Sequence, residues 1–185
     1  MCPSNSPAGE VQIPVGYTYH AATNKYYKPY KGLQDWEGAQ LKCSSDGATL
    51  IESRTSAEHE KLRWMFGELE NVRRLYSVLT FISTDHHLES NDFWTGLVNP
   101  NKMFCIREAT CLNIVHWVSD GTPYDTEVYP GHKLFFNNGY FCARYQDYID
   151  YRTGNFGIDD KDCSAKYYFA CEFSCNLNGK TTKAT

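Results

Sequence analysis

The stretch Cys142–Glu172 reads CARYQDYIDYRTGNFGIDDKDCSAKYYFACE. Two of its cysteines, Cys142 and Cys163, bracket a polar loop that is rich in tyrosine and aspartate. The third, Cys171, ends an aromatic run, and short runs of Tyr and Phe are typical of β-strands. The stretch therefore predicts a long loop between two cysteines, followed by a strand close to the C-terminus.

Length and composition place the chain among proteins that bury a core of their own. Its 185 residues suit a single domain, and 42% apolar with 22% charged residues is ordinary for a globular protein. A net charge of −4 favours neither nucleic acid nor an anionic membrane as a partner. The longest apolar segment, residues 75–82, is too short to cross a bilayer. We therefore expect no nucleic-acid partner and no membrane span.

The eight cysteines indicate an oxidising environment. They are spread along the chain without paired C-x-x-C motifs, a pattern that favours disulfides over a zinc site. Residues 1–5 have no basic start and no apolar run, so we expect that a signal peptide has been removed. The sequence therefore predicts a secreted, extracellular protein.

The N-terminal half predicts a hairpin, a helix and a buried strand. Residues 17–20 and 26–30 have strand character around a turn at Thr23 and Asn24. Pro29 predicts an edge position for the second strand, because proline has no amide hydrogen to donate. The segment 33–45 predicts a helix capped by Asp35 and ended by Gly47, before a buried strand at 48–51.

A second helix is predicted from its first turn. Thr55 and Glu58 form a capping box, in which the hydroxyl and the carboxylate each accept from a free amide. Apolar residues then recur at helical spacing: Leu62, Met65, Phe66 and Leu69. Beyond a polar loop at 83–92, the runs 93–97 and 115–118 predict two core strands.

Several motifs, in order, resemble those of the C-type lectin-like domain. Phe93-Trp94-Thr95-Gly96-Leu97 is similar to the family's Trp-Ile-Gly-Leu core motif, and Trp117-Val118-Ser119-Asp120-Gly121 to its Trp-x-x-Asp-Gly turn. Ile158–Cys163 keeps the spacing and final aspartate of the loop-end signature Trp-Asn-Asp-x-x-Cys, but not its tryptophan. The resemblance implies an α+β fold, with two helices flanking small antiparallel sheets and a long disulfide-stapled loop region. It places an arm at 1–15, the domain at 16–173 and a tail at 174–185.

Eight cysteines allow 105 pairings, so spacing alone does not choose among them. The resemblance implies Cys43 with Cys171, and Cys142 with Cys163. Cys105 and Cys111 form a local pair, and Cys2 and Cys175 remain near the two ends. The last two either close one chain or link two, so the protein is a monomer or a disulfide-linked dimer. Electrophoresis without reductant separates these alternatives by mass.

Calcium is the cofactor that the resemblance raises. In sugar-binding members, a calcium ion in the long loop binds the sugar hydroxyls, and calcium needs six to eight oxygens. The family takes them from an acidic or amide triplet around a cis-proline, a glutamate two residues before the third framework cysteine, and the loop-end pair. Here the triplet is Tyr129-Pro130-Gly131, Tyr140 replaces the glutamate, and only Asp159 and Asp160 remain. Calcium is therefore not expected to bridge the sugar.

Two interpretations of the acidic residues stay open. One is a solvated loop that binds nothing, which is the common behaviour of such loops. The other is a weak, relocated calcium site formed by Asp150, Asp159 and Asp160, or by Glu127 in place of Asp150. Calcium is therefore a cofactor only under the second interpretation.

A group of tyrosines lies in or beside this loop region, and such residues supply contact area at low entropy cost. The group comprises Tyr124, Tyr129, Tyr140, Tyr145, Tyr148 and Tyr151. Family cores are aromatic, so half of them could instead be packed inside. The candidate ligand-binding residues are Glu127, Tyr129, Pro130, His132, Tyr148, Asp159 and Asp160.

Catalytic patterns are incomplete in this sequence. His59-Glu60 lacks the histidine four residues on that a metalloprotease needs, and there is no Gly-x-Ser-x-Gly elbow or phosphate-binding glycine loop. We expect an extracellular binding module and no enzyme. Its expected ligand is carbohydrate or glycoconjugate, bound without the usual calcium bridge. The alternative is a protein-binding or structural domain with no sugar ligand.

Overall fold

A computed structural model describes residues 13–55, 57–58, 61–62, 65, 92–101, 114–124, 134–135, 140–146 and 157–174. In chain order its elements are β1 (Thr18–His20), β2 (Lys25–Gln34), α1 (Trp36–Ser45), β3 (Thr49–Leu50), β4 (Phe93–Val98), β5 (His116–Trp117), β6 (Leu134–Phe135), β7 (Cys142–Gln146), β8 (Gly157–Lys161) and β9 (Tyr167–Ser174).

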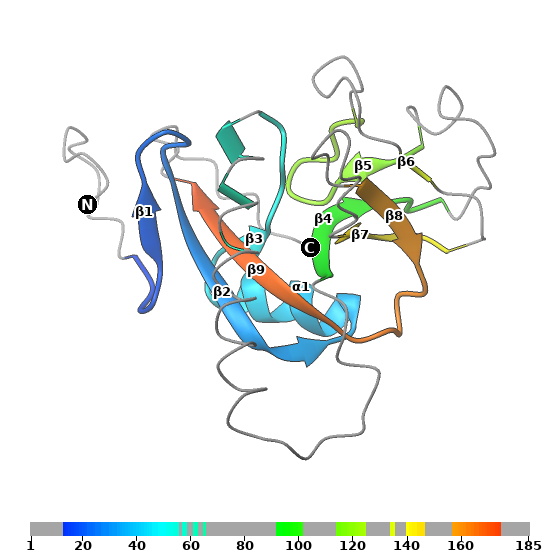
Figure 1. Cartoon of the computed structure of the whole chain (residues 1–185), viewed down its shortest axis with the longest axis horizontal. Helices are drawn as coiled ribbons and strands as arrows, with labels where there is room; N and C mark the ends of the chain where they lie inside the picture. The colour runs from blue at the N-terminus through cyan, green and yellow to red at the C-terminus, as the bar shows by residue number, and fades with distance from the viewer. Residues whose placement is uncertain are drawn as a thin grey trace.

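The described strands form one sheet around the last of them, β9. The strand order is β1-β2-β9-β4-β7-β8-β6, with β3 also on β9 and β5 on β4 (Figure 1). Most pairings are antiparallel, but β4 with β9 and β6 with β8 are parallel. The α+β class is confirmed, whereas the expectation of small antiparallel sheets is corrected to one mixed sheet. The reason is that β9 lies between the N-terminal hairpin and β4, and so joins the two halves.

The predicted N-terminal hairpin is confirmed, but the edge position of its second strand is wrong. The turn before β2 contains Asn24 with φ of 53°, and asparagine tolerates this left-handed backbone better than most residues. β2 lies between β1 and β9, with Pro29 opposite Ala170. The pairing of β2 with β1 ends at Tyr27, so Pro29 lies beyond the stretch that needs a donor toward β1.

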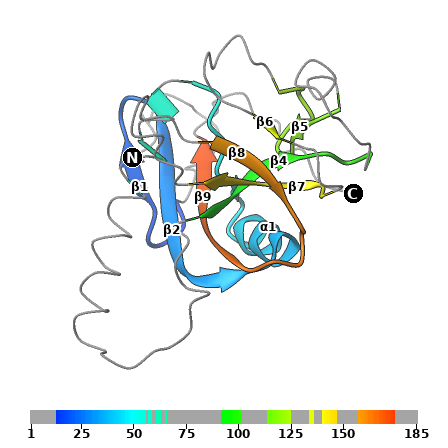
Figure 2. The same ribbon diagram turned by 45° about the vertical axis from the view of Figure 1, so that its right-hand side comes forward.

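Helix α1 begins three residues later than predicted. Leu33 and Gln34 extend β2, and Gln34 pairs with Tyr167 of β9. Asp35 is the N-cap, as predicted, and its carboxylate accepts from the amide of Gly38 at 2.8 Å. After the helix, Gly47 has φ of 69°, a left-handed conformation that glycine adopts without cost. Figure 2 shows α1 lying beside β9.

The core consists of two clusters that meet at β4. All five residues 93–97 are buried, which confirms the predicted core strand. Trp94 is fully buried, donates through Nε1 to Gln34 O at 2.8 Å, and meets the ring of Tyr167 edge-on at 4.9 Å. Trp36 donates to Thr95 O at 2.9 Å and so ties α1 to the same strand. The largest fully buried side chains include Trp94, Tyr27, Tyr145, Phe93, Phe169, Leu50, Ile51, Leu97 and Ile158.

The first turn of the second predicted helix has the expected capping contacts. Thr55 Oγ1 accepts from the amide of Glu58 at 3.2 Å, and Glu58 Oε2 accepts from the amide of Arg54 at 2.7 Å. The described residues 57–58, 61–62 and 65 have helical backbone, and Leu62 and Met65 are buried in the core. Phe66 and Leu69 lie outside the described residues.

Two disulfides cross-link the described elements. Cys43 of α1 is bonded to Cys171 of β9, and Cys142 of β7 to Cys163 just after β8. These are the two pairings that the resemblance implied. The other four cysteines, Cys2, Cys105, Cys111 and Cys175, lie outside the described residues. Within the part of the chain that the structure describes, no helix is long and apolar enough to cross a membrane.

Candidate functional site

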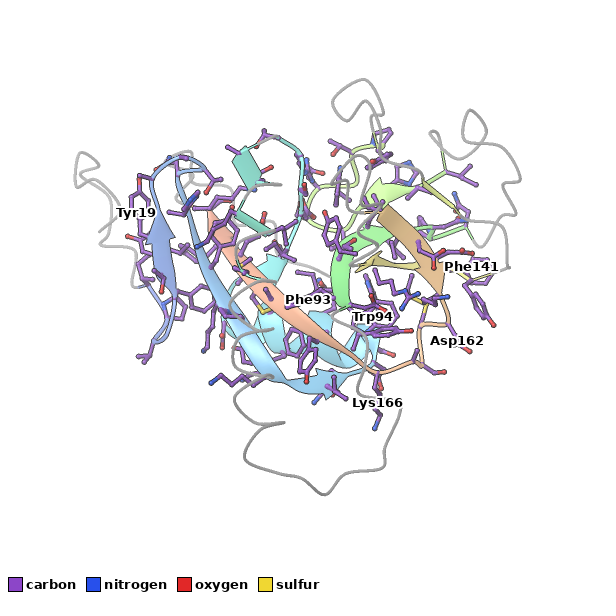
Figure 3. The ribbon with its side chains drawn as sticks, in the orientation of Figure 1. Tyr19, Phe93, Trp94, Phe141, Asp162 and Lys166 are labelled. Atoms are coloured by element: carbon purple, nitrogen blue, oxygen red, sulfur yellow. A yellow bond between two sulfur atoms is a disulfide. The ribbon has the colours of Figure 1, made fainter. Side chains whose placement is uncertain are left out.

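Residues 158–161 of the loop-end signature lie in strand β8, which is placed between β7 and the end strand β6. β7 and β8 are antiparallel, with Cys142 opposite Lys161 and Gln146 opposite Gly157. The described ladder thus runs from the Cys142–Lys161 pair at one end to the Gln146–Gly157 pair at the other. Phe141 and Asp162 adjoin the Cys142–Lys161 pair, and Figure 3 shows them on one side of the molecule with Tyr19 of β1 on the other.

The two loop-end aspartates face opposite sides of β8, because successive strand residues alternate. Asp160 is opposite Ala143 and fully buried, on the same face as the core residue Ile158. Asp159 is opposite Arg144, and its side chain is 20% exposed. The carboxylates of Asp159 and Asp160 therefore do not converge on a single metal-binding position.

Asp159 belongs to a compact group of four charged side chains and one tyrosine. This group is here called the Arg144 cluster and is defined by Asp92, Arg144, Asp159, Lys161 and Tyr167. The Arg144 guanidinium forms ion pairs with Asp92 through Nη1 and, at 3.3 Å, with Asp159 through Nη2. It also donates to the Tyr167 hydroxyl at 3.3 Å and lies 5.0 Å from the centre of that ring. Lys161 Nζ is 3.2 Å from the Asp159 carboxylate.

The described loop-end residues do not fit a calcium ion. Calcium needs several convergent oxygens with spare negative charge, but the Asp159 carboxylate already contacts two cations, Arg144 and Lys161. Asp160 faces the core instead. Among the described residues there is also no group of three or more His, Cys, Asp or Glu side chains arranged to hold a metal.

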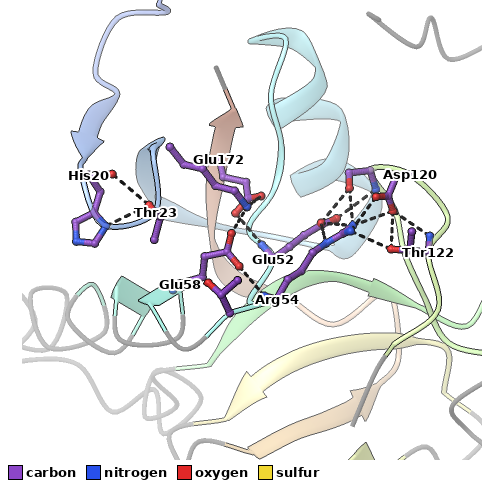
Figure 4. A network of polar contacts seen from close by, with 11 residues as sticks. His20, Thr23, Glu52, Arg54, Glu58, Asp120, Thr122 and Glu172 are labelled. Carbon is purple, nitrogen blue, oxygen red and sulfur yellow. Dashed lines mark hydrogen bonds and ion pairs between the residues drawn. The ribbon is translucent and has the colours of Figure 1, made fainter. Parts of the chain in front are cut away.

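A second polar network supports the Trp117–Gly121 turn (Figure 4). Arg54 forms two hydrogen bonds with the Asp120 carboxylate, at 2.8 and 2.9 Å, and its Nη2 is 2.7 Å from Glu52. Hydrogen bonds from Arg54 hold the pKa of Asp120 well below its usual range. Glu52 is 2% exposed and accepts from the Ser119 hydroxyl at 2.9 Å. The turn is thereby joined to the segment after β3.

Glu52 also explains the glycine of the core motif. A Cβ at Gly96 would lie 2.9 Å from Glu52 Cγ and 3.1 Å from the carbonyl oxygen of Leu50. Real Cβ atoms essentially never approach within 3.0 Å of another heavy atom. The motif therefore needs glycine at this position because a buried glutamate lies against its Cα.

The same network continues to the last strand. Glu172 of β9 is 4% exposed, and its carboxylate accepts from the amide of Glu52 at 3.1 Å and from Lys25 Nζ at 2.7 Å. Lys25 also forms an ion pair with Glu58. Burial raises the pKa of Glu172 to about 7, opposed by Lys25 and reinforced by Glu52. Among Lys25, Glu58 and Glu172, the sequence pattern indicated a role only for Glu58, as a helix-capping residue.

The predicted ligand-binding residues divide into two groups. Asp159 and Asp160 are in β8, as described above, whereas Glu127, Tyr129, Pro130, His132, Tyr148 and Asp150 lie outside the described residues and stay predictions. Of the tyrosines in the loop region, Tyr124 and Tyr145 are core residues, 2% and 0% exposed. Tyr140 is 39% exposed, two residues before β7 begins.

Comparison with solved structures identifies the fold. The calcium-independent C-type lectin SPL-2 from Saxidomus purpuratus matches with a TM-score of 0.54 and 22% identity, over 88% of this chain and 94% of that one. Human lithostathine matches with a TM-score of 0.54 and 19% identity, over 87% and 98%. The C-type lectin domain of murine dendritic cell inhibitory receptor 2, in complex with N-glycan, matches with a TM-score of 0.52 and 16% identity, over 88% and 99%.

No family model and no curated protein sequence matches the chain. Because the identities to the solved structures are low, the likeness establishes the fold and leaves the ligand open. The chain has the C-type lectin-like fold, as a divergent example of it.

Proposed function

We propose that this chain is a secreted binding module that recognises carbohydrate or glycoconjugate without a calcium bridge. The surface proposed to bind, here called the long-loop face, is defined by Tyr140, β7, β8 and Asp162. The observation that carries the proposal is that the Asp159 carboxylate forms ion pairs with two cations of the chain itself. This carboxylate stands where the resemblance implies a calcium ligand, yet Arg144 and Lys161 already neutralise it. A ligand on this face would therefore contact side chains directly.

The solved structures that share the fold support both halves of this proposal. One is described as a calcium-independent C-type lectin, and another as a C-type lectin domain in complex with N-glycan. The disulfides Cys43–Cys171 and Cys142–Cys163 support secretion, because such bonds persist mainly outside the cytosol. We propose no catalytic activity for this chain.

Tyr140 is the described aromatic residue best placed to contact a sugar. It is 39% exposed and precedes β7, next to the disulfide that closes the β7–β8 ladder. An exposed tyrosine offers an apolar ring for the C–H face of a sugar and a hydroxyl for hydrogen bonding. Lys161 ends the neighbouring strand β8 and Asp162 follows it, so both would offer polar groups to a ligand there.

A glycan array with the purified chain tests the proposal, in calcium and in chelator. We expect one group of related glycans to bind with equal signal in both buffers. Tyr140→Ala should weaken the signal, whereas Tyr19→Ala should not, because Tyr19 is equally exposed at 41% but lies on β1 at the far end. An array without a bound glycan would contradict carbohydrate recognition and favour the alternative, a protein-binding or structural domain.

A further inference from the structure

Arg144 is a buried cation at the place where the resemblance implies a metal ion. Its side chain is almost fully buried and contacts two carboxylates, that of Asp92 before β4 and that of Asp159 in β8. We infer that Arg144 is the built-in cation of the long-loop face, and that its guanidinium, in place of calcium, neutralises the loop-end carboxylate and positions β8. This inference rests on the proposed calcium-independent function.

The first argument is burial. Asp92 is 3% exposed and Arg144 is 7% exposed, and an isolated charge so removed from water is strongly disfavoured unless it is paired and hydrogen-bonded. Arg144 meets this need with ion pairs to both aspartates, a hydrogen bond to the Tyr167 hydroxyl and a contact over the Tyr167 ring. Each buried charge therefore requires the others.

The second argument is position. Arg144 is directly opposite Asp159 in the β7–β8 ladder, and opposite Trp94 on its other side in β4. Two residues earlier, Cys142 is bonded to Cys163. A covalent link and an ion pair thus close the same ladder two steps apart. Through its two ion pairs, Arg144 of β7 is joined to Asp159 of β8 and to Asp92, directly before β4.

The third argument is charge. Asp92 and Asp159 carry two negative charges, and Arg144 and Lys161 carry two positive ones, so the cluster is neutral. A calcium ion added beside them would face two cations within a few ångströms, where repulsion between like charges is large. Because the guanidinium is covalently part of the chain, the cluster keeps this cation whatever the calcium concentration.

The experiment compares thermal unfolding of the whole chain, without any glycan, in calcium and in chelator. The variants are Arg144→Met, and Arg144→Met combined with Asp92→Asn and Asp159→Asn. Lys161→Met is the matched control, because it removes the other cation of the cluster, whose side chain is 28% exposed. Since no ligand is used, a failed glycan array has no bearing on this result.

The wild type should melt at the same temperature in both buffers. Arg144→Met should melt lower by on the order of 10 °C, because two carboxylates lose their buried partner, and calcium should restore part of that loss. The triple variant should recover stability relative to Arg144→Met and should ignore calcium. Lys161→Met should shift melting little and show no calcium response.

The opposite pattern overturns the inference. A wild type that calcium stabilises, or a triple variant no more stable than Arg144→Met, would show that the guanidinium does not act through its charge. If Arg144→Met fails to fold, the triple variant decides: a folded triple variant supports the inference, and an unfolded one contradicts it.

Discussion

Lys25 Nζ lies 2.7 Å from Glu172 Oε1 and also forms an ion pair with Glu58. One ammonium group thus joins β2, β9 and the first turn of the second helix. Glu172 is almost fully buried beside Glu52, so the single ammonium group of Lys25 lies among three glutamates. This excess of carboxylates makes the free energy of unfolding depend on pH.

Glu172 should make the protein less stable as pH rises toward neutrality. Its pKa is raised from 4.5 to about 7, so the folded chain binds this proton more tightly than the unfolded chain. The stabilising contribution is complete below pH 4.5 and is lost as pH passes through about 7. Urea unfolding across this range should show it as a difference between wild type and Glu172→Gln. If the wild type gains stability relative to the variant over the range, the assignment is wrong.

Gly96→Ala should destabilise the fold by on the order of 2 kcal/mol, because the new Cβ would overlap Glu52 and approach the Leu50 carbonyl. Gly32→Ala in β2 is the matched control, since no atom lies within 4 Å of a Cβ built there. Its effect should stay within about 0.5 kcal/mol. Denaturant midpoints measure both, and equal losses at the two glycines would refute the steric explanation.

Arg54→Met should cost about 2 kcal/mol, because it leaves the buried Glu52 carboxylate without its cation and releases the Asp120 turn. The partial exposure of Arg54, 27%, keeps the cost below that of a fully buried pair. Lys28→Met, which breaks a longer pair with Asp46 at 3.4 Å, should cost less than about 1 kcal/mol. Equilibrium unfolding in urea compares them. The ranking would fail if Lys28→Met were the more damaging change.

Replacing the Cys43–Cys171 pair by alanines should destabilise more than replacing Cys142–Cys163. The first bond closes a loop of 128 residues and the second a loop of 21. The chain-entropy model then assigns about 5 kcal/mol to the first and about 3 kcal/mol to the second. Guanidinium unfolding of the two double variants measures both losses of stability. A larger loss for the variant without Cys142–Cys163 would contradict the prediction.

Local chemistry explains what could be predicted from the sequence. The cap at Asp35 and the helix end at Gly47 depend on residues only a few positions apart. The apolar composition of the run 93–97 likewise predicts that it is buried. The start of α1 was misplaced because pairing of Gln34 with Tyr167 extends β2, a tertiary contact that overrides helical propensity.

The Arg144 cluster and the Glu172 network could not be predicted, because their partners are far apart in sequence. Asp92 and Arg144 are separated by 52 residues, and Lys25 and Glu172 by 147. For Tyr145 and Tyr124 the sequence left both binding and core packing open, and they are core residues. A tyrosine in a polar stretch gives no sign of which face of its strand it occupies.

The central claim is carbohydrate binding without calcium, and calorimetry with the strongest glycan from the array tests it most directly. The dissociation constant should be the same, within about twofold, in chelator and in millimolar calcium, because Arg144 already provides the positive charge beside Asp159. A loss of binding in chelator that calcium restores would contradict the account.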